Sequence, residues 1–505
     1  MHSSTAEFNE LMLSRLRSTD VEKMTASGDS GGERNEVHSA RPWFPLITYE
    51  GVFANAFILL TGGAFLTGAA LMFGANDFEI GLLAAIPFLA QMAQMFSAVI
   101  IDQTGKRKAI TVWSLAFSRQ IWWLLLPVLL LAGKGQLYIL IGIVAVSSVA
   151  NMIASPGWMS WVADLVPDRL RGRYFGRRNA VISVSTITAT VGGGVVLDKF
   201  RAIDLEHVGF FVIFAVACIC ALVALIIMTK TPDHRSQKSD QPFAWAYILE
   251  PLKDRSFRHL LAVFFFWNIA IGISAAFFVP HMLNNLKMSF TLISVYGTLA
   301  TMVAIILYRP WGVIIDRFGS KPVIVLCAFA IGFVPLIWLI PRPGYLGILW
   351  FEALFTGVIW SGFNLASFNI PIANSPKEGR PIYLAMFAVI AGIGFFAASV
   401  LGGTIAEHLR GLHHPWGKQT IVNYHVLFVI SSIFRVLAAS FMITFHEPRE
   451  KSFPVMIQFM GYAILRRLSF GRQLFPWASR LESGAAFGKG ISQPLLPPRL
   501  FANSS

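Results

Sequence analysis

Three charged residues stand deep inside long apolar stretches of the sequence, where ionised side chains are uncommon. They are Arg119, Glu352 and Arg435. If these stretches cross a membrane, each charge costs roughly 2.5–3.5 kcal/mol on insertion scales, so it usually faces a cavity or a partner. We expect Glu352 to be either a protonatable functional group or the partner of an intramembrane ion pair. Arg119 and Arg435 either favour an anionic ligand or pair with neighbouring helices and carbonyl groups.

A second group of candidates consists of side-chain amides inside the same stretches. An amide in hydrocarbon can bond a ligand or can bond a neighbouring helix at about 0.6 kcal/mol, and both interpretations stay open. Asn55 and Asn268 occupy matching positions in the first and seventh stretches. The complete set of candidate amides is Asn55, Gln91, Gln94, Asn151, Asn268 and Asn364.

These residues sit in a chain whose composition is that of a membrane protein. Of its 505 residues, 55% are hydrophobic and 13% are charged, against roughly 25% charged in soluble domains. The apolar residues come in twelve blocks without the alternation of a barrel strand, so each block is predicted to be a membrane-spanning helix. The expected spans are 48–73, 80–101, 109–132, 137–163, 179–197, 209–229, 258–281, 290–311, 322–340, 344–372, 383–405 and 424–445.

The sequence also carries an internal duplication. Asp102 to Arg107 reads DQTGKR, and Asp316 to Lys321 reads DRFGSK. The separation between the two aspartates differs by a single position from the separation between Asn55 and Asn268. A nearly constant offset between two loops and two spans indicates two halves of six helices in the same orientation. The glycines Gly105 and Gly319 are expected to make tight turns with positive φ.

With these motifs the chain resembles the major facilitator superfamily over residues 45–445. The family signature after the second helix, Gly-x-x-x-Asp-Arg/Lys-x-Gly-Arg/Lys-Arg/Lys, is nearly complete in the second copy and departs in the first at Ala98 and Gln103. The resemblance implies a latch between the two bundles that forms when the cytoplasmic side is closed. The residues assigned to it are Asp102, Gly105, Lys106, Arg107, Arg171, Gly312, Asp316, Arg317, Gly319 and Lys321. It also implies that the helices of Asn55, Asn268 and Glu352 line or border a central cavity, with Arg119 and Arg435 mostly outside it.

Charge in the loops predicts the orientation. The loops after the even-numbered spans hold nineteen Lys and Arg residues and the opposite loops hold seven, so the richer side and both termini are expected in the cytoplasm. The net charge of +14 is attributed to this topology rather than to nucleic-acid binding. The expected organisation is a disordered tail (1–46), a first bundle (47–229), a central cytoplasmic loop (230–257), a second bundle (258–445) and a C-terminal tail (446–505).

Together these features predict an all-α multi-pass protein of the plasma (inner) membrane, a monomer that moves a small solute by alternating access. The solute, which the arginines suggest is anionic, is expected to bind midway across the lipid bilayer, at a site around which the two bundles rock. A coupled ion, a proton at Glu352, is the hypothesis for the energy source. No cofactor, metal or ATP-binding motif is expected. The alternatives are a non-transporting receptor or sensor of the same fold and, less favoured, an integral lipid-modifying enzyme.

Overall fold

The computed structural model describes residues 43–461 apart from 131–134, 167, 234–248, 377–379, 418, 446 and 448–452, with the backbone alone at 102, 163, 168–173 and 416. The tails 1–42 and 462–505 lie outside these residues. The chain divides into two compact units, Met1–Pro448 and Arg449–Ser505. In the second unit, residues 453–461 form a short helix. All elements below belong to the first unit.

The N-terminal half of this unit holds the helices of the first six predicted spans. They are α4 (Trp43–Leu60), α5 (Gly63–Met72), α6 (Asp77–Leu89), α7 (Met92–Thr104), α8 (Arg107–Gln120), η1 (Ile121–Leu124), α9 (Leu125–Leu130), α10 (Gln136–Leu165), α11 (Asp168–Arg201) and α12 (Glu206–Lys230). Several spans are broken helices, since α4 and α5, α6 and α7, and α8 and α9 each share one crossing.

The C-terminal half repeats this plan. It contains α14 (Glu250–Lys253), α15 (Arg255–Ala275), α16 (Phe278–Pro280), η2 (His281–Asn285), α17 (Phe290–Phe318), α18 (Ser320–Ile337), α19 (Gly347–Asn374), α20 (Arg380–His408), β1 (His413–Trp416), β2 (Gln419–Val422) and α21 (Asn423–Met442). The two strands pair antiparallel as a hairpin between α20 and α21. Within the described residues, twelve helical segments are long and apolar enough to cross a membrane, so the twelve predicted spans are confirmed.

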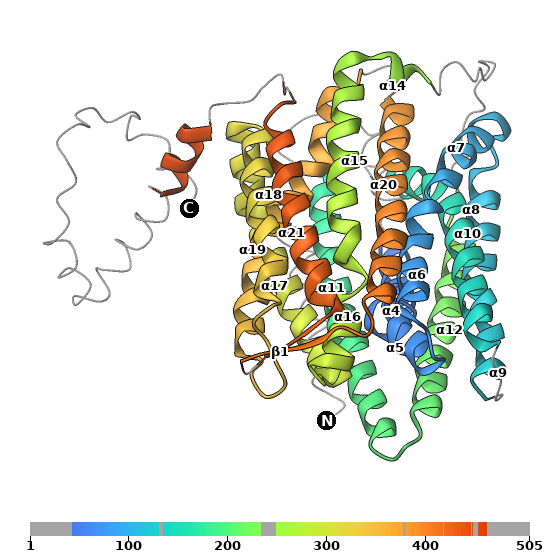
Figure 1. Cartoon of the computed structure of the whole chain (residues 1–505). Coiled ribbons are helices and arrows are strands. Elements are labelled where there is room, and N and C mark those ends of the chain that lie inside the picture. Colours follow the sequence, from blue (N-terminus) through green and yellow to red (C-terminus); the bar gives the residue numbers. More distant parts are fainter. Residues whose placement is uncertain are drawn as a thin grey trace, which may run out of the picture. The chain divides into compact units, whose positions relative to one another are not determined.

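The helices run between two ends of the bundle, which Figure 1 shows in side view. We call the end that carries β1, α5 and α16 the hairpin end. The other end, which carries the tops of α7 and α8 together with α14, is the motif end because the Gly105 turn lies there. The unbroken helix α17 starts beside α5 at the hairpin end, so its far end at Gly319 also reaches the motif end. Both copies of the duplicated motif therefore lie on the same side.

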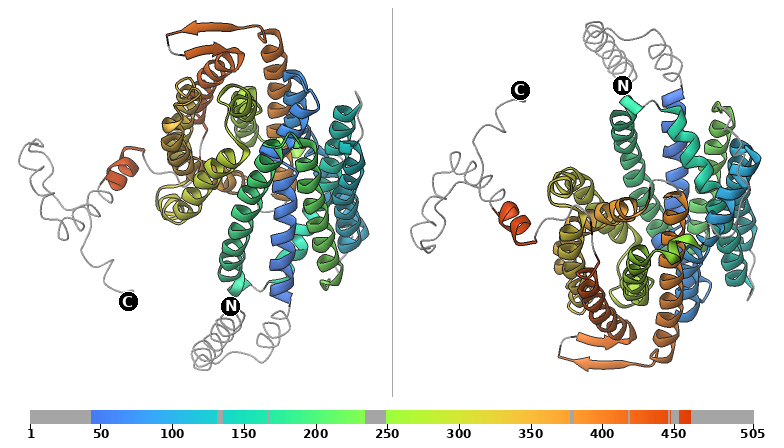
Figure 2. Two further views of the ribbon diagram at one scale, coloured as in Figure 1. Left: turned by 90° about the horizontal axis from the view of Figure 1, so that it is seen from below. Right: turned by 90° about the horizontal axis from the view of Figure 1, so that it is seen from above.

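The two halves meet along two helix pairs, α6 with α20 and α11 with α17. Views along the bundle show the N-terminal helices on one side and the C-terminal helices on the other, with α20 between them (Figure 2). Small residues permit the closest approach, because a methyl group at Gly403 would lie 2.9 Å from the Asp77 carbonyl oxygen. A methyl group at Gly194 would lie 2.8 Å from the Phe290 carbonyl oxygen. The glycine-rich ends predicted for the fifth span of each half therefore mark helix contacts between the halves.

Candidate functional site

The most informative polar contacts join the two halves at the hairpin end. Asp198, near the end of α11, accepts the backbone N–H groups of Phe290 and Thr291 at 2.9 and 2.8 Å. Glu407, near the end of α20, accepts the backbone N–H of Asp77 at 3.0 Å. Each carboxylate thus binds the N-terminus of a helix in the opposite half, where free amide groups and the helix dipole favour negative charge.

These two contacts are copies of one another. The separation of Asp77 and Phe290 along the chain equals that of Asn55 and Asn268. In both halves the carboxylate belongs to the fifth span and the receiving amide to the second span of the other half. We call the pair Asp198 with α17 and Glu407 with α6 the carboxylate links. They join the two halves at the hairpin end in this structure.

The side chain of Asp77 adds a third connection at this end. It is buried, and it accepts hydrogen bonds from the Asn423 amide at 2.7 Å and the Tyr424 hydroxyl at 2.6 Å. One turn further along α6, the Ser399 hydroxyl donates to the carbonyl of Gly81 at 2.9 Å. The start of α6 is therefore fastened to both α20 and α21 of the C-terminal half.

At the motif end, the described contacts of the duplicated motif stay within each half. The buried guanidinium of Arg107 pairs with Asp164 at 2.5 Å and with Asp233 at 3.0 Å. In the second half, Glu447 accepts the backbone N–H groups of Ser320 at 3.1 Å and Lys321 at 2.7 Å. Asp233 and Glu447 are separated by the same offset as Asp102 and Asp316 of the motif itself. In each half, an acidic residue shortly after the sixth span thus binds the start of the third span.

The turn glycines of the motif behave as predicted, with φ of 62° at Gly105 and 91° at Gly319. Lys106 and Asp316 are exposed, and the Arg317 guanidinium lies 5.7 Å from the Phe318 ring centre. Gly312 sits on α17 facing Leu365. The side chains of Asp102 and Arg171 lie outside the described part of the structure. The latch between the halves at this end stays a prediction.

Glu352 is the centre of a buried polar group in the C-terminal half. Its carboxylate accepts from the Tyr296 hydroxyl, from the Thr356 hydroxyl at 2.6 Å and from the Trp338 indole. Only 1% of the Glu352 residue surface is exposed, whereas Tyr296 on α17 is half-buried. The groups that reach Glu352 are neutral donors rather than the cation of an ion pair, and Tyr296 connects it to a helix that meets the other half.

The two intramembrane arginines lie inside their own halves. Arg119 on α8 pairs with Glu50 on α4 at 3.3 Å, and both are buried. Arg435 on α21 donates to the Ser274 hydroxyl at 3.1 Å and to the Ile331 carbonyl at 3.5 Å. These contacts follow the structural interpretation of the arginines, which packs them against neighbouring helices and carbonyls.

The candidate amides are distributed over both halves. Asn55 donates to Thr186 on α11 at 2.9 Å, and Asn268 donates to the Phe264 carbonyl of its own helix at 2.8 Å. The remaining four differ in exposure: Gln91, Gln94 and Asn151 are half-buried and Asn364 is exposed. The structure does not gather these amides into one cluster with Glu352.

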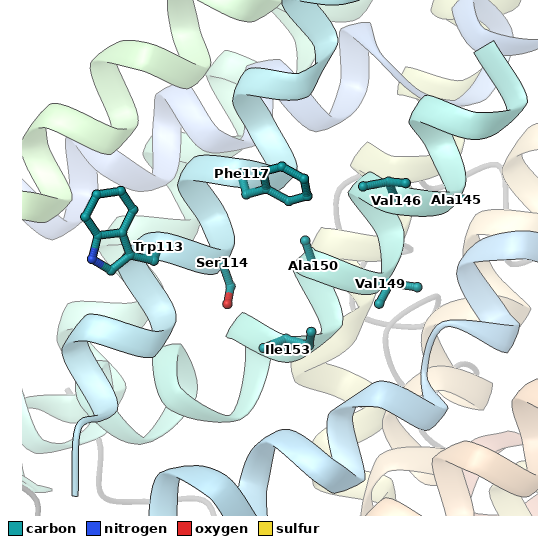
Figure 3. Close-up of a pocket in the computed structure, with 8 residues that line it drawn as sticks. All are labelled: Trp113, Ser114, Phe117, Ala145, Val146, Val149, Ala150 and Ile153. Carbon is teal, nitrogen blue, oxygen red and sulfur yellow. The ribbon is translucent and has the colours of Figure 1, made fainter. Parts of the chain in front are cut away.

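A cavity of about 530 Å³ lies in the N-terminal half between α8 and α10 (Figure 3). Its lining is apolar apart from Ser114, and Trp113 at its edge is 76% exposed. Such a lining offers mainly van der Waals contact, which suits acyl chains better than a polar solute. This groove is therefore separate from the polar contacts between the halves.

Comparison with known proteins places this arrangement in a family. A family profile described as the Major Facilitator Superfamily matches residues 51–280 and again residues 269–484. The chain belongs to the major facilitator superfamily. This family consists of membrane transporters rather than enzymes, so the enzyme alternative falls away, and the predicted fold of two six-helix bundles is confirmed.

Individual relatives are distant. The chain is 27% identical over 228 residues to the minor myo-inositol transporter IolF of Bacillus subtilis, covering 41% of this chain and 48% of that protein. It is 21% identical over 345 residues to multidrug resistance protein 2 of the same organism, covering 66% and 81%. The chain thus spans about half the length of the first of these relatives.

Solved structures show the same fold. The nucleoside transporter NupG superposes with a TM-score of 0.60 at 14% identity, covering 79% of this chain and 100% of that one. A D-xylose–proton symporter gives a TM-score of 0.61 at 15% identity, covering 80% and 97%. At these identities the likeness concerns the arrangement of the helices.

The residues of the carboxylate links were not among the predicted site residues, although the sequence carries a signal for them. In both fifth spans an acidic residue follows the last glycine by four positions, Asp198 after Gly194 and Glu407 after Gly403. Aligning the two halves on these glycines would have paired the acids. Glu50 was also overlooked because it stands near the start of its span, where a charge is common.

Proposed function

We propose that this protein is a secondary active transporter that moves a small solute across the membrane by alternating access of its two halves. The observation that carries the proposal is the pair of carboxylate links at the hairpin end. They join the halves through contacts that a rocking motion can break and remake without unfolding either bundle.

The free energy that the carboxylate links contribute is small enough for the hairpin end to close reversibly. A carboxylate at a helix N-terminus contributes about 0.3–1 kcal/mol, and up to about 2 kcal/mol when partly buried. Two such links, with the hydrogen bonds to Asp77, give a few kcal/mol between the open and closed states, the range in which a ligand can shift populations. In this view the hairpin end closes while the motif end opens, and the excess of Lys and Arg in the loops at the motif end supports a cytoplasmic position for it.

The proposed substrate is a small polar solute, and the pairing of Arg119 with Glu50 and of Arg435 with Ser274 leaves its charge open. Similar proteins are named as transporters of myo-inositol, nucleosides and D-xylose or as multidrug resistance proteins, and these define a first panel of solutes. We further propose that Glu352 couples transport to protons. Its three donors suit the ionised form, whereas a protonated carboxyl group carries its own O–H donor on one oxygen, which would reorganise the contact with Tyr296 on α17.

The test is solute counterflow in proteoliposomes holding the purified full chain, with labelled myo-inositol, uridine, D-xylose and ethidium offered separately. The double substitution Thr190→Cys and Thr298→Cys allows a reversible disulfide to lock the two halves together. The two native hydroxyls lie 3.4 Å apart, one on α11 and the other on α17. We expect saturable flux of at least one solute, which stops when the disulfide forms and returns on reduction. An equal solute flux with and without the disulfide would contradict alternating access. Solute binding without flux would support the receptor alternative.

A further inference from the structure

A second polar cavity lies wholly within the C-terminal half at the hairpin end. Its volume is about 260 Å³, and its lining comes from η2, the loop between α18 and α19, the β1–β2 hairpin and the start of α21. The polar residues on which the argument rests are His281, Asn285, Arg342, Gln419 and His425. None of them takes part in the carboxylate links or in the Glu352 group.

Two buried histidines form the inner wall of this cavity. His281 is 1% exposed and His425 is 4% exposed, and their ring centres are 5.0 Å apart. The Nε2 atom of each ring is buried without a hydrogen-bond partner among the described residues. A buried polar nitrogen left unpaired costs about 1–3 kcal/mol, so two of them side by side call for a ligand that satisfies both.

The contacts of the other ring nitrogens fix which atoms carry protons. Nδ1 of His425 accepts the backbone N–H of Val422 at 3.1 Å, so a neutral His425 must hold its proton on Nε2. Nδ1 of His281 lies 3.2 Å from the Asn285 amide nitrogen, which can only donate. Both unpaired Nε2 atoms are therefore N–H donors, and each needs an acceptor.

This protonation pattern selects the class of ligand. A metal ion would need the lone pair of Nε2, and metal-bound histidines normally donate their other N–H outward instead of accepting one. An anion uses N–H donors directly. None of the described residues lining the cavity is acidic, while Arg342 brings a fixed positive charge.

We propose that this cavity binds a small anion, a carboxylate or an inorganic oxyanion, whose oxygens accept from Nε2 of His281 and His425 and face the Arg342 guanidinium. The surrounding loop is positioned for this role. Gln419 donates to the carbonyls of Leu339 and Pro341 at 3.2 and 3.0 Å, which fastens the hairpin to the loop that carries Arg342. The proposal does not depend on the transport substrate, since none of these residues takes part in the carboxylate links or in the Glu352 group.

The test is thermal unfolding of the purified full chain in detergent, with sodium isethionate replaced at constant ionic strength by sodium acetate, sodium succinate or sodium phosphate. We expect at least one of these anions to raise Tm in a saturable way. In His281→Phe, which keeps the ring volume, and in Arg342→Gln, which alters a half-buried loop residue, the midpoint concentration should rise at least tenfold.

His414→Phe is the matched control, because His414 is an exposed residue of the same hairpin that does not line the cavity. Its midpoint should equal that of the unmodified chain. The proposal is overturned if none of the three anions raises Tm above the isethionate value, or if both His281→Phe and Arg342→Gln keep the original midpoint. Arg342→Gln keeps the experiment decisive if His281→Phe does not fold.

Discussion

Replacing Asp198 by Asn should loosen the hairpin end by a predictable amount. The carboxylate accepts two backbone N–H groups of α17, at 2.9 and 2.8 Å. Asn keeps the size of the side chain and one acceptor oxygen, but it loses the charge that the helix N-terminus favours and leaves one N–H without its partner. Together these losses amount to about 1–2 kcal/mol. That energy corresponds to a factor of roughly 5–30 in the equilibrium between closed and open states.

The assay measures how often the hairpin end opens. Thr298 on α17 is half-buried and faces Thr190 on α11 between the halves, so we expect Thr298→Cys to react faster with a membrane-impermeant maleimide when the halves separate. The background would lack the native thiols Cys218, Cys220 and Cys327. If opening is fast relative to labelling, the labelling rate follows the open population and should rise by roughly 5–30-fold in Asp198→Asn.

Asp204→Asn is the control for charge alone. Asp204 is an exposed carboxylate six positions further on, and its φ of 55° suits Asn equally well. The Asp204→Asn substitution removes one negative charge from the same end of the bundle and leaves the contacts of Asp198 with α17 unchanged. An Asp198→Asn rate within twofold of the parent, or an equal rise in Asp204→Asn, would refute the reasoning that these carboxylate contacts hold the halves together.

Three further substitutions test other parts of the structure. Gly403→Leu should prevent closure, since even a methyl group would lie 2.9 Å from the Asp77 carbonyl oxygen, and maleimide labelling in the Thr298→Cys background should then be fast without Asp198→Asn. Arg119→Leu should lower stability by about 3–5 kcal/mol by leaving the Glu50 charge buried and unpaired, and adding Glu50→Leu should recover most of the loss in a thermal unfolding measurement. Glu352→Gln should abolish accumulation driven by a pH gradient while leaving solute counterflow; persistent pH-driven accumulation would remove proton coupling at this residue.

Most of the architecture could be predicted from the sequence because two strong signals determine it. Apolar blocks long enough to cross the bilayer must be helical, since hydrocarbon leaves no other way to satisfy the backbone. The repeated offset between Asp102 and Asp316 then relates the halves. The positive φ of Gly105 and Gly319 followed from turn chemistry alone. Each of these predictions uses information that is local or periodic in the chain.

The contacts of the candidate site could not be predicted in the same way, because they depend on which helices pack together. The sequence places a break between spans after residue 73, and the structure has one there, but the sequence does not indicate that Asn76 caps α6 or that Asp77 binds Asn423 and Tyr424 from the far end of the chain. The position of Arg119 inside an apolar span predicts that it has a partner, but the sequence does not identify that partner as Glu50. Long-range pairing of this kind requires the packed structure.

The duplication places acidic residues at both ends of the molecule, and the two ends use them differently. At the motif end, Asp233 and Glu447 bind within their own halves, and Asp233 meets a buried guanidinium whose pairing costs about 3–5 kcal/mol to break. At the hairpin end, Asp198 and Glu407 bind across the halves through links of at most about 2 kcal/mol each. We therefore expect the carboxylate links to open before the pairing of Asp233 with the buried Arg107 guanidinium breaks. That order of energies is what rigid-body rocking requires, and it arises from the same residue type placed by one repeated sequence.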